Sequence, residues 1–393
     1  MGGIGVDYLA SVAAYPEAND KLRTQQLEVQ GGGNCGNALT ATARLGLQPV
    51  IISKVGNDAM GDTIVQGLED EGIDATHVLR GEGASPFTYI IVDQEGGTRT
   101  CIHTPGPALD PMEITAPLLQ DALDGAALVY FDGRLTEAAL LVAEAASKAG
   151  VPILVEAERL RPNLEKLLPY ADYVITSETF PSSWTGEELV GNALLEMASR
   201  LPDAKFIVTT LGSEGSMLFE WKEPDDMAAA KTAVPVEEVI RRLKHKANSG
   251  ADDKVTVHSS GLLSLASSGK ECAEAARAKA IEAAQAAAIS NADSGNAERY
   301  LASADPGSLE MLDEDRRQFF GEILFCPSWP TEVIDTTGAG DAFIGTMCYS
   351  LCTGLSREKS LMLSSFVAAT KCRQLGPRPG LPRIADVPAS LLN

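Results

Sequence analysis

The feature that most constrains the fold is a regular alternation of short apolar segments and helical segments in the middle of the chain. Strands are predicted at residues 128–131, 152–156, 173–176 and 206–210, with helices at 137–149 and 189–200 between them. Strands that alternate with helices of about a dozen residues form βαβ units around a parallel sheet. We therefore expect an α/β fold that binds ligands at the carboxyl ends of its strands.

The residues before this alternation predict a smaller set of elements. We expect a helix from Ala38, a strand at residues 49–55 and a second helix at residues 61–71. Residues 86–92 and 98–102 alternate apolar and polar side chains on either side of a turn rich in Asp and Gly. That pattern predicts a β-hairpin.

One long segment departs from the pattern. From about Glu223 to Phe320 the chain is rich in Ala, Ser, Lys and Glu and lacks sheet-like runs. Residues 273–288 favour a helix by propensity, but their apolar side chains are nearly all alanine, so the helix would bury little surface. We expect a low-complexity insertion at about 223–320 in a single domain spanning 1–393. A second, small helical domain is the alternative.

The composition argues against several kinds of partner. The chain has 393 residues and a formal net charge of −22, from 54 acidic residues against 32 Lys and Arg. A general basic surface for nucleic acid or for an anionic membrane is therefore not expected. No apolar run approaches the roughly 18 residues of a membrane-spanning helix.

The cysteines and the first residues bear on the cellular compartment. Seven cysteines occur without a CxxC pair, which is typical of reduced thiols inside the cell, and no secretory signal peptide is recognisable. Met1 to Asp7 resembles the end of a buried strand, either a short native one or one whose upstream part is absent. We expect the cytoplasm, or the chloroplast stroma if a transit peptide has been removed.

The segment from Asp335 to Phe343, DTTGAGDAF, carries the strongest chemical signal. An extended segment precedes it and an apolar helical pattern follows from Ala342, so we expect a strand, a glycine-rich turn and a helix start. Glycines and the first N–H groups of a helix bind phosphate. Asp341 would repel a resting phosphate but suits a base that takes a proton from an attacking hydroxyl, which indicates phosphoryl transfer to an alcohol. An ordinary helix start capped by an acid is the alternative.

A second glycine-rich turn, GGGNCGN, ends at Asn37. Gly33 and the two glycines before it remove side chains from one wall, and Asn34 and Asn37 could both face a ligand rich in hydroxyls. Asp7, at the end of the first predicted strand, would be a second hydroxyl anchor. Together these residues predict a sugar site. A tight turn with an asparagine N-cap is the alternative.

Two weaker signals concern the phosphates. Thr210 ends a predicted strand and could meet a nucleotide phosphate, while Gly212 and Gly215 would let the backbone pass close to it. Many turns of α/β proteins look the same. Arg99, on the predicted hairpin, could neutralise the transferring phosphate, although such an arginine is more often a solvated strand residue.

The motifs resemble those of one family, the ribokinase-like sugar kinases of the phosphofructokinase-B (pfkB) type. The family signature D-T-x-G-A-G-D is present from Asp335 to Asp341, and a GGN-type helix start is present from Gly32. The G-x-D-x-x-G element follows at residues 56–61. Ketohexokinase-like members and plant-type pfkB proteins are the most similar. GxxxxGK[ST], GxSxG and HExxH motifs are absent.

The resemblance implies a three-layer fold with a central, mainly parallel sheet and a small β lid from about residues 8–30 and 85–103. It implies transfer of the γ-phosphoryl group of ATP to a hydroxymethyl group of a small sugar, a ketohexose or pentose, with Asp341 as base. The N–H groups of Gly338, Ala339 and Gly340 would form the anion hole. The sugar would be held by Asp7, Gly33, Asn34, Asn37 and Arg99, and ATP by Thr210, Gly212 and Gly215.

The resemblance also implies ions and an oligomeric state. Asp335 and Thr337, with residues 373–376, would hold a monovalent cation, usually K⁺. Many members organise Mg²⁺ through water with an Asn-x-x-Glu motif, and here the aligned residues are Ser-Glu-Thr-Phe at 177–180. Glu156, Glu158 or Glu178 would have to substitute. Exchange of the lid strands makes many such kinases homodimers.

Three other functions remain open at the level of the sequence. A nucleoside kinase shares every motif but needs a flat apolar or aromatic pocket, which an aromatic content of 5% disfavours. A non-catalytic scaffold protein of the same fold would be expected to lack the aspartate that is present here as Asp341. A metabolite-binding regulator is the third.

Overall fold

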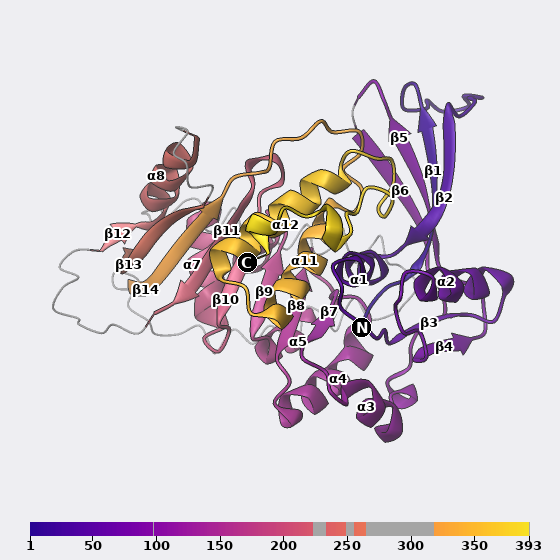
Figure 1. The fold of residues 1–393 in the computed structure, drawn as a ribbon, viewed down its shortest axis with the longest axis horizontal. Helices are drawn as coiled ribbons and strands as arrows, with labels where there is room; N and C mark the ends of the chain where they lie inside the picture. The colour runs from indigo at the N-terminus through magenta and orange to yellow at the C-terminus, as the bar shows by residue number, and fades with distance from the viewer. Residues whose placement is uncertain (97, 223–232, 249–254, 265–317, 393) are drawn as a thin grey trace.

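The computed structural model describes residues 1–96, 98–222, 233–248, 255–264 and 318–392 (Figure 1). Its centre is an eight-stranded sheet with the order β12-β13-β14-β11-β10-β9-β8-β7. The strands are β7 (Val129–Phe131), β8 (Ile153–Ala157), β9 (Tyr173–Thr176), β10 (Phe206–Thr210), β11 (Ser216–Trp221), β12 (Val234–Pro235), β13 (Thr256–Ser264) and β14 (Gln318–Cys326). The predicted helix at 273–288 lies outside the described residues.

The strands predicted from the alternation form the parallel part of this sheet. Each pair of neighbours from β7 to β10 is parallel. Beyond β10 the chain turns back, so that β11, β14 and β13 are each antiparallel to the strand before them in the sheet. The sheet is therefore mixed, with the predicted βαβ units at one end and mainly antiparallel strands at the other.

Helices cover both faces of the sheet and make the three layers that the sequence predicts. One apolar core joins the sheet to α4 (Thr136–Ala149), α5 (Leu164–Leu167), α6 (Phe180–Thr185), α7 (Val190–Arg200) and α8 (Val236–Asn248). The other joins it to α1 (Asn34–Arg44), α2 (Ala59–Glu69), α11 (Ala339–Thr353) and α12 (Arg357–Lys371). Successive residues of a strand face opposite cores, so Leu154 and Glu156 lie on the α1 and α11 face while Ile153 and Val155 lie on the other.

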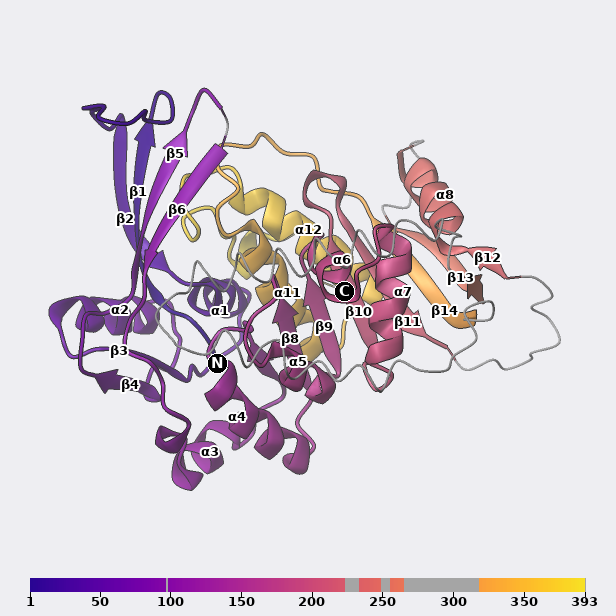
Figure 2. The ribbon, with the colours of Figure 1, turned by 180° about the vertical axis from the view of Figure 1, so that it is seen from behind.

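A separate four-stranded sheet, which we call the lid sheet, contains β1 (Gly5–Val12), β2 (Gln26–Gly32), β5 (Phe87–Asp93) and β6 (Thr98–Thr104) in the order β2-β1-β5-β6. It lies at the opposite end of the molecule from α8 and β12 (Figures 1 and 2). The predicted hairpin is β5 and β6. The prediction that Asp7 ends the first strand is wrong, because β1 continues past Asp7 to Val12.

Four shorter elements complete the amino-terminal half. These are β3 (Ser53–Gly56), β4 (Val78–Gly81), α3 (Ala116–Leu123) and the 3-10 turn at Pro111–Glu113. β3 and β4 pair in parallel beside the lid sheet. Among the described residues, the structure has no helix long and apolar enough to cross a membrane.

The prediction that residues 223–320 lack sheet-like runs is wrong for the part of this segment that the structure describes. β12, β13 and the start of β14 extend the main sheet, and α8 covers it. Val236, Val239, Ile240 and Leu243 of α8 are all at most 5% exposed. Their spacing of three and four residues is typical of a helix with one apolar face on the core. The polar composition of the surrounding segment outweighs this pattern in the prediction from the sequence.

Candidate active site

Two motifs that lie far apart in the sequence meet where α1 packs on α11. A Cβ on Gly345 would lie 2.1 Å from the carbonyl oxygen of Ala38, so only glycine permits this approach of the two helices. The hydroxyl of Thr42 stabilises this contact between α1 and α11 by donating a hydrogen bond to the carbonyl oxygen of Gly345 at 2.9 Å. As a result, Nδ2 of Asn37 donates to Oδ2 of Asp341 at 2.8 Å, although the two residues are 304 positions apart.

The glycine-rich turn before Asp341 starts α11 as predicted, but no strand leads into it. Residues 332–334 belong to no strand, and the N–H of Ile334 donates to the carbonyl oxygen of Cys372 at 2.8 Å. Gly338 caps the helix with φ 77°, a left-handed conformation that favours glycine. The N–H of Ala339 donates to Thr336 O at 3.1 Å, so Gly338 and Gly340 are the better anion-hole donors.

Asp341 is poised to exchange a proton near neutral pH. Burial raises the pKa of this carboxyl to about 7, while the hydrogen bond from Asn37 and the charge of Arg134 oppose the increase. A general base works best when its pKa lies close to the working pH. The first turn of α11 therefore places a carboxyl that can take up a proton next to glycine N–H groups that can bind an anion.

The glycines of the GGGNCGN turn make room for protein groups. A Cβ on Gly31 would lie 2.2 Å from Nη1 of Arg378, and one on Gly32 would lie 2.3 Å from the carboxyl group of Asp7. Gly33 has φ 84° and its Cβ would lie 2.5 Å from the carbonyl oxygen of Gly3. The predicted smooth wall is thus occupied by Asp7 and Arg378, and burial raises the pKa of Asp7 to about 6.

Asn34 belongs to a charged cluster at the ends of β7 and β8. Gly33, and not an asparagine, is the N-cap of α1, so the alternative of an asparagine cap is wrong. Oδ1 of Asn34 accepts from Nη2 of Arg134 at 2.8 Å, and its Nδ2 lies 3.4 Å from Oε1 of Glu156. The hydroxyl of Tyr130 donates to Oε2 of Glu156 at 2.6 Å. Each oxygen of this buried carboxyl therefore has one hydrogen-bond donor, Asn34 or Tyr130.

The three glutamates named as partners for Mg²⁺ differ sharply in their surroundings. Glu156 is buried, and burial together with the nearby charge of Asp341 raises its pKa to about 8. Glu158 forms ion pairs with three arginines, and Glu178 is exposed. Within the described residues no group of three His, Cys, Asp or Glu side chains could hold a metal. Of the three glutamates Glu156 alone is buried, and it interacts electrostatically with Asp341, so it is the best placed of them to bind a magnesium ion through water.

The predicted monovalent-cation residues are already well bonded to the protein. Oδ1 of Asp335 accepts from the N–H and hydroxyl of Thr337 at 2.9 and 2.7 Å, and Oδ2 accepts from the N–H of Gly376 at 2.8 Å. Lys371, which is fully buried, donates to the carbonyl oxygen of Asp335 at 2.7 Å. A cation here would have to be completed by carbonyl oxygens beside an existing ammonium group.

The remaining predicted residues lie in two places. Arg99 of the lid sheet donates to the hydroxyl of Thr336, so it lies over the DTTGAGD turn. Thr210 donates to the carbonyl oxygen of Thr176 at 3.1 Å at the end of β10. Gly212 has open space beside it, but a Cβ on Gly215 would lie 2.0 Å from Cys326 O, so Gly215 is required by packing against β14.

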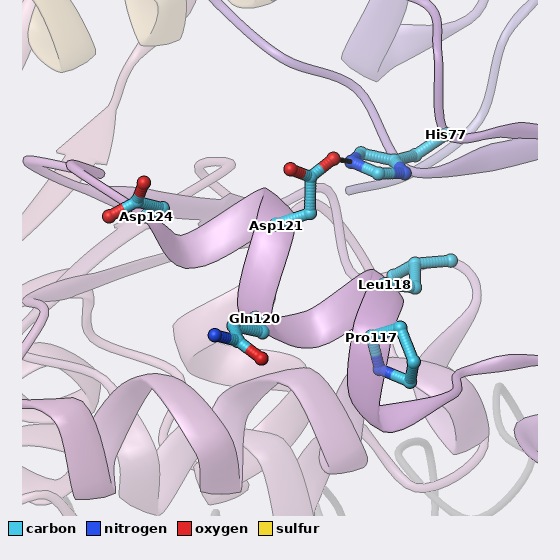
Figure 3. Close-up of a pocket in the computed structure, with 6 residues that line it drawn as sticks. All are labelled: His77, Pro117, Leu118, Gln120, Asp121 and Asp124. Atoms are coloured by element: carbon cyan, nitrogen blue, oxygen red, sulfur yellow. Dashed lines mark ion pairs between the residues drawn. The ribbon is translucent and has the colours of Figure 1, made fainter.

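A surface cavity away from these residues has a volume of about 640 Å³ (Figure 3). It is lined by His77, Pro117, Leu118, Gln120, Asp121 and Asp124. Nε2 of His77 lies 3.1 Å from Oδ2 of Asp121. None of the residues that the motifs single out contributes to this cavity.

Sequence reasoning missed two buried cations of the site, Arg378 and Lys371. Lys371 is the last residue of α12, and Arg378 lies in the Gly- and Pro-rich segment that follows it. No spacing rule links them to the motifs. Their roles follow from contacts with Asn37 and Asp335 across the fold.

Comparison with known proteins agrees with the motifs. A model of the family described as "pfkB family carbohydrate kinase" matches residues 6–297 and 320–384, which confirms the resemblance stated from the sequence. The ketohexokinase of Mus musculus is 25% identical over 288 residues, 70% of this chain and 91% of that protein. The ribokinase of Haemophilus influenzae is 26% identical over 220 residues, 55% of this chain and 72% of that protein.

Solved structures agree on the fold. The structure of Arabidopsis thaliana ribokinase complexed with ribose and ATP superposes with a TM-score of 0.64 at 18% identity, covering 100% of this chain and 97% of that one. The likeness confirms the predicted ribokinase-like three-layer α/β architecture.

Proposed function

The chain belongs to the pfkB family of carbohydrate kinases, and from this premise we propose that it transfers the γ-phosphoryl group of ATP to a hydroxymethyl group of a ketohexose or pentose, with Asp341 as base. Its relatives are kinases of pentoses and hexoses, so the chain is a sugar kinase, a phosphotransferase with an alcohol acceptor. The observation that carries the role of Asp341 is its place on the first turn of α11, bonded to Asn37.

In this proposal the sugar hydroxyl gives its proton to Asp341 as its oxygen attacks the γ-phosphorus, the bond from that phosphorus to the β,γ-bridging oxygen breaks, and ADP leaves. The N–H groups of Gly338 and Gly340, at the amino end of α11, bind the oxygens of the transferring group. Bound Mg²⁺ would neutralise phosphate charge, with Glu156 near it through water. Arg99, already bonded to Thr336, adds positive charge over the same turn.

The sugar would lie between the lid sheet and α1. Asp7 projects from β1 beside Gly32 and Arg378, and a carboxyl with a pKa of about 6 can accept bonds from sugar hydroxyls near neutral pH. Gly33 and Asn34 form the first turn of α1 beside it. The carbonyl oxygen of Asn37 accepts from Arg378 and one of its N–H groups donates to Asp341, so its second N–H remains for a substrate.

ATP would lie on the other side of the DTTGAGD turn, against Thr210 and Gly212, with Gly215 shaping that turn. A K⁺ ion at Asp335 and Thr337 would add to the charge of Lys371. Rates in potassium chloride and in tetramethylammonium chloride at equal ionic strength test this ion. Equal rates in the two salts would remove K⁺ from the proposal.

We also propose that the chain forms a homodimer through the lid sheet. Val29, Tyr8, Tyr89 and Ile102 lie side by side across the four strands, because each is the register partner of the next. Val29, Tyr89 and Ile102 are 57, 51 and 53% exposed. An apolar row of this kind on an exposed sheet is typical of an interaction surface.

Light scattering after gel filtration tests the dimer. Tyr89→Asp should yield a monomer, and Val257→Asp, an exposed apolar position at the far end of the molecule, should leave the dimer intact. A monomeric wild-type protein would refute the proposal.

The substrate is tested by measuring ADP release from ATP with ketoses, pentoses and nucleosides in parallel. We expect turnover with a ketohexose or a pentose and none with nucleosides. A nucleoside preference would make the chain a nucleoside kinase of the same family. No turnover with any acceptor, together with tight binding of a sugar, would favour a non-catalytic protein.

A further inference from the structure

A buried arginine joins the lid sheet to the proposed base. Arg378 lies in the loop after α12 and is 8% exposed. Its Nε donates to Oδ1 of Asn37 at 3.0 Å, and its Nη2 donates to the carbonyl oxygen of Gly32 at 3.2 Å. We propose that Arg378 is a positioning residue that orients the amide of Asn37 and so holds Asp341 ionised and correctly aimed. This inference rests on the proposed role of Asp341 as the base.

The hydrogen bonds from Arg378 through Asn37 to Asp341 have a fixed direction. A guanidinium group has only donors, so it can meet only the carbonyl oxygen of the Asn37 amide. The amide nitrogen must then face Asp341, and it lies 2.8 Å from Oδ2. An ionised carboxylate accepts this bond, and bonds to the charged form favour that form. The arrangement therefore selects the state that a general base needs.

The chain is built to admit this guanidinium. A Cβ on Gly31 would lie 2.2 Å from Nη1 of Arg378, and a Cβ on Gly36 would lie 2.7 Å from Nη2. Two glycines of the GGGNCGN turn thus make the space that the arginine fills. The backbone of Arg378 is held separately, because Nη1 of Arg44 donates to its carbonyl oxygen at 2.7 Å. Removing the side chain of Arg378 should therefore leave the loop anchored.

The charges around the site support the same role. Burial lowers the pKa of Arg378 to about 10, so the side chain stays charged at neutral pH. Its charge lowers the pKa of Asp7 and attracts Asp341. Loss of that charge should therefore make both carboxyls harder to ionise. The other charged or titratable groups that act on Asp341 are Asp7, Arg134, Glu156, Glu158 and Lys371.

The experiment compares Arg378→Gln with Arg44→Gln, which removes a second arginine that fastens the same loop but does not touch Asn37. The pH dependence of kcat/KM and the melting temperature are measured for both. We expect Arg378→Gln to move the acidic limb of the profile upward by roughly 0.5–1 pH unit, because an opposite charge near a carboxyl shifts its ionisation by about that much or more. Arg44→Gln should lower the melting temperature and leave the limb in place.

Arg378→Lys keeps the charge and should restore most of the wild-type profile. If Arg378→Gln does not fold, Asn37→Ser removes the amide while keeping the arginine and must displace the limb in the same direction. If the acidic limb of the kcat/KM profile stays in place in Arg378→Gln, Arg378 has only a structural role and the inference is overturned. The same holds for Asn37→Ser if Arg378→Gln does not fold.

The inference and the proposed function fail separately. Wild-type turnover in Asp341→Asn would refute the proposed base, whatever the arginine variants show. An inactive Asp341→Asn together with an unmoved limb in Arg378→Gln would refute the role of Arg378 alone.

Discussion

The two ends of the eight-stranded sheet bury different kinds of side chain. At the β7 and β8 end, Asp132 and Glu156 are buried on the face that α1 and α11 cover, next to Arg134 and Asn34. At the β13 and β14 end, the core under α8 is made of side chains such as Ile240 and Leu263. Burying charge costs free energy and burying apolar surface gains it. The first end therefore buries charged groups at a cost in stability, as an active site does, and the second buries apolar side chains that stabilise the fold.

This contrast predicts that substitutions at the two ends affect different measurements. Changes at the α1 and α11 end should alter turnover with little effect on folding. Changes under α8 should lower the free energy of unfolding and leave the turnover of the folded fraction unchanged. Each prediction below tests one side of that division.

The largest effect is expected for Asp341→Asn. Asparagine has nearly the same shape but cannot accept the proton, so kcat should fall by about 10²–10⁴-fold, the usual contribution of a general base. The melting temperature near neutral pH should not decrease. Steady-state ADP release and calorimetry on one preparation check both statements. Turnover within about threefold of wild type would remove Asp341 from the mechanism.

The second prediction concerns the far end of the sheet. Leu263→Ala in β13 should lower the free energy of unfolding by roughly 2–5 kcal/mol, because it leaves a cavity in a closely packed core. Leu263 has no exposed surface, whereas Val257 in the same strand is 38% exposed. Val257→Ala is therefore the matched control and should cost far less. Denaturant titration gives the two values, and equal losses would show that the described part of 223–320 does not pack as a core.

Much of the main sheet could be predicted from the sequence, and the reason is local. Residues 128–210 carry strand and helix patterns whose periods agree with the final elements, so no distant contact had to be known. The motifs likewise identified Asp341 and Asn37, because glycine-rich helix starts are local features. α8 could have been found from its apolar stripe. β13, TVHSSGLLS, could not, because a short strand rich in Ser and Gly lacks the usual composition.

The contacts inside the site could not be predicted from the sequence. The bond between Asn37 and Asp341 depends on the approach of two helices at Gly345, which no local pattern encodes. The same holds for Arg378 and Lys371, whose partners lie in other parts of the chain. The sequence indicates that the glycines of GGGNCGN remove side chains from one wall of the site, but it does not show which groups lie beside them. What fills the space became clear only from the three-dimensional arrangement.

A third prediction uses the raised pKa of Asp341. Burial raises this pKa in the folded state to about 7, from the model-peptide value of 3.8. The folded state then binds the proton more tightly than the unfolded state between these values, so this group's contribution to stability decreases as pH rises from about 4 to 7. Asp341→Asn removes that loss. Its melting temperature should match wild type near pH 4, exceed it increasingly up to about pH 7, and keep a constant excess above that pH.

Melting curves at several pH values measure this difference, with Glu95→Gln, an exposed carboxyl in the lid hairpin, as control. If the difference in melting temperature between Asp341→Asn and wild type is constant across the pH range, ionisation of Asp341 does not lower the stability of the fold and the prediction is wrong.

The smallest effect is expected for Glu178→Gln, and it tests which glutamate serves the metal. Glu178 follows β9 where the family often places its Asn-x-x-Glu motif, but its side chain is exposed. Glu156 is buried between Tyr130 and Asn34 and acts electrostatically on Asp341. A group that touches neither substrate nor base should change the Mg²⁺ dependence of the rate little. We therefore expect Glu178→Gln to stay within about twofold of wild type, since substitutions of exposed residues away from such features are nearly neutral. Glu156→Gln should require clearly more Mg²⁺ for half-maximal rate, because it removes a buried carboxyl that interacts electrostatically with Asp341. The opposite result, in which Glu178→Gln needs more Mg²⁺ for half-maximal rate than Glu156→Gln, would place the metal on the β9 side of the site. Glu156 would then not bind the metal through water.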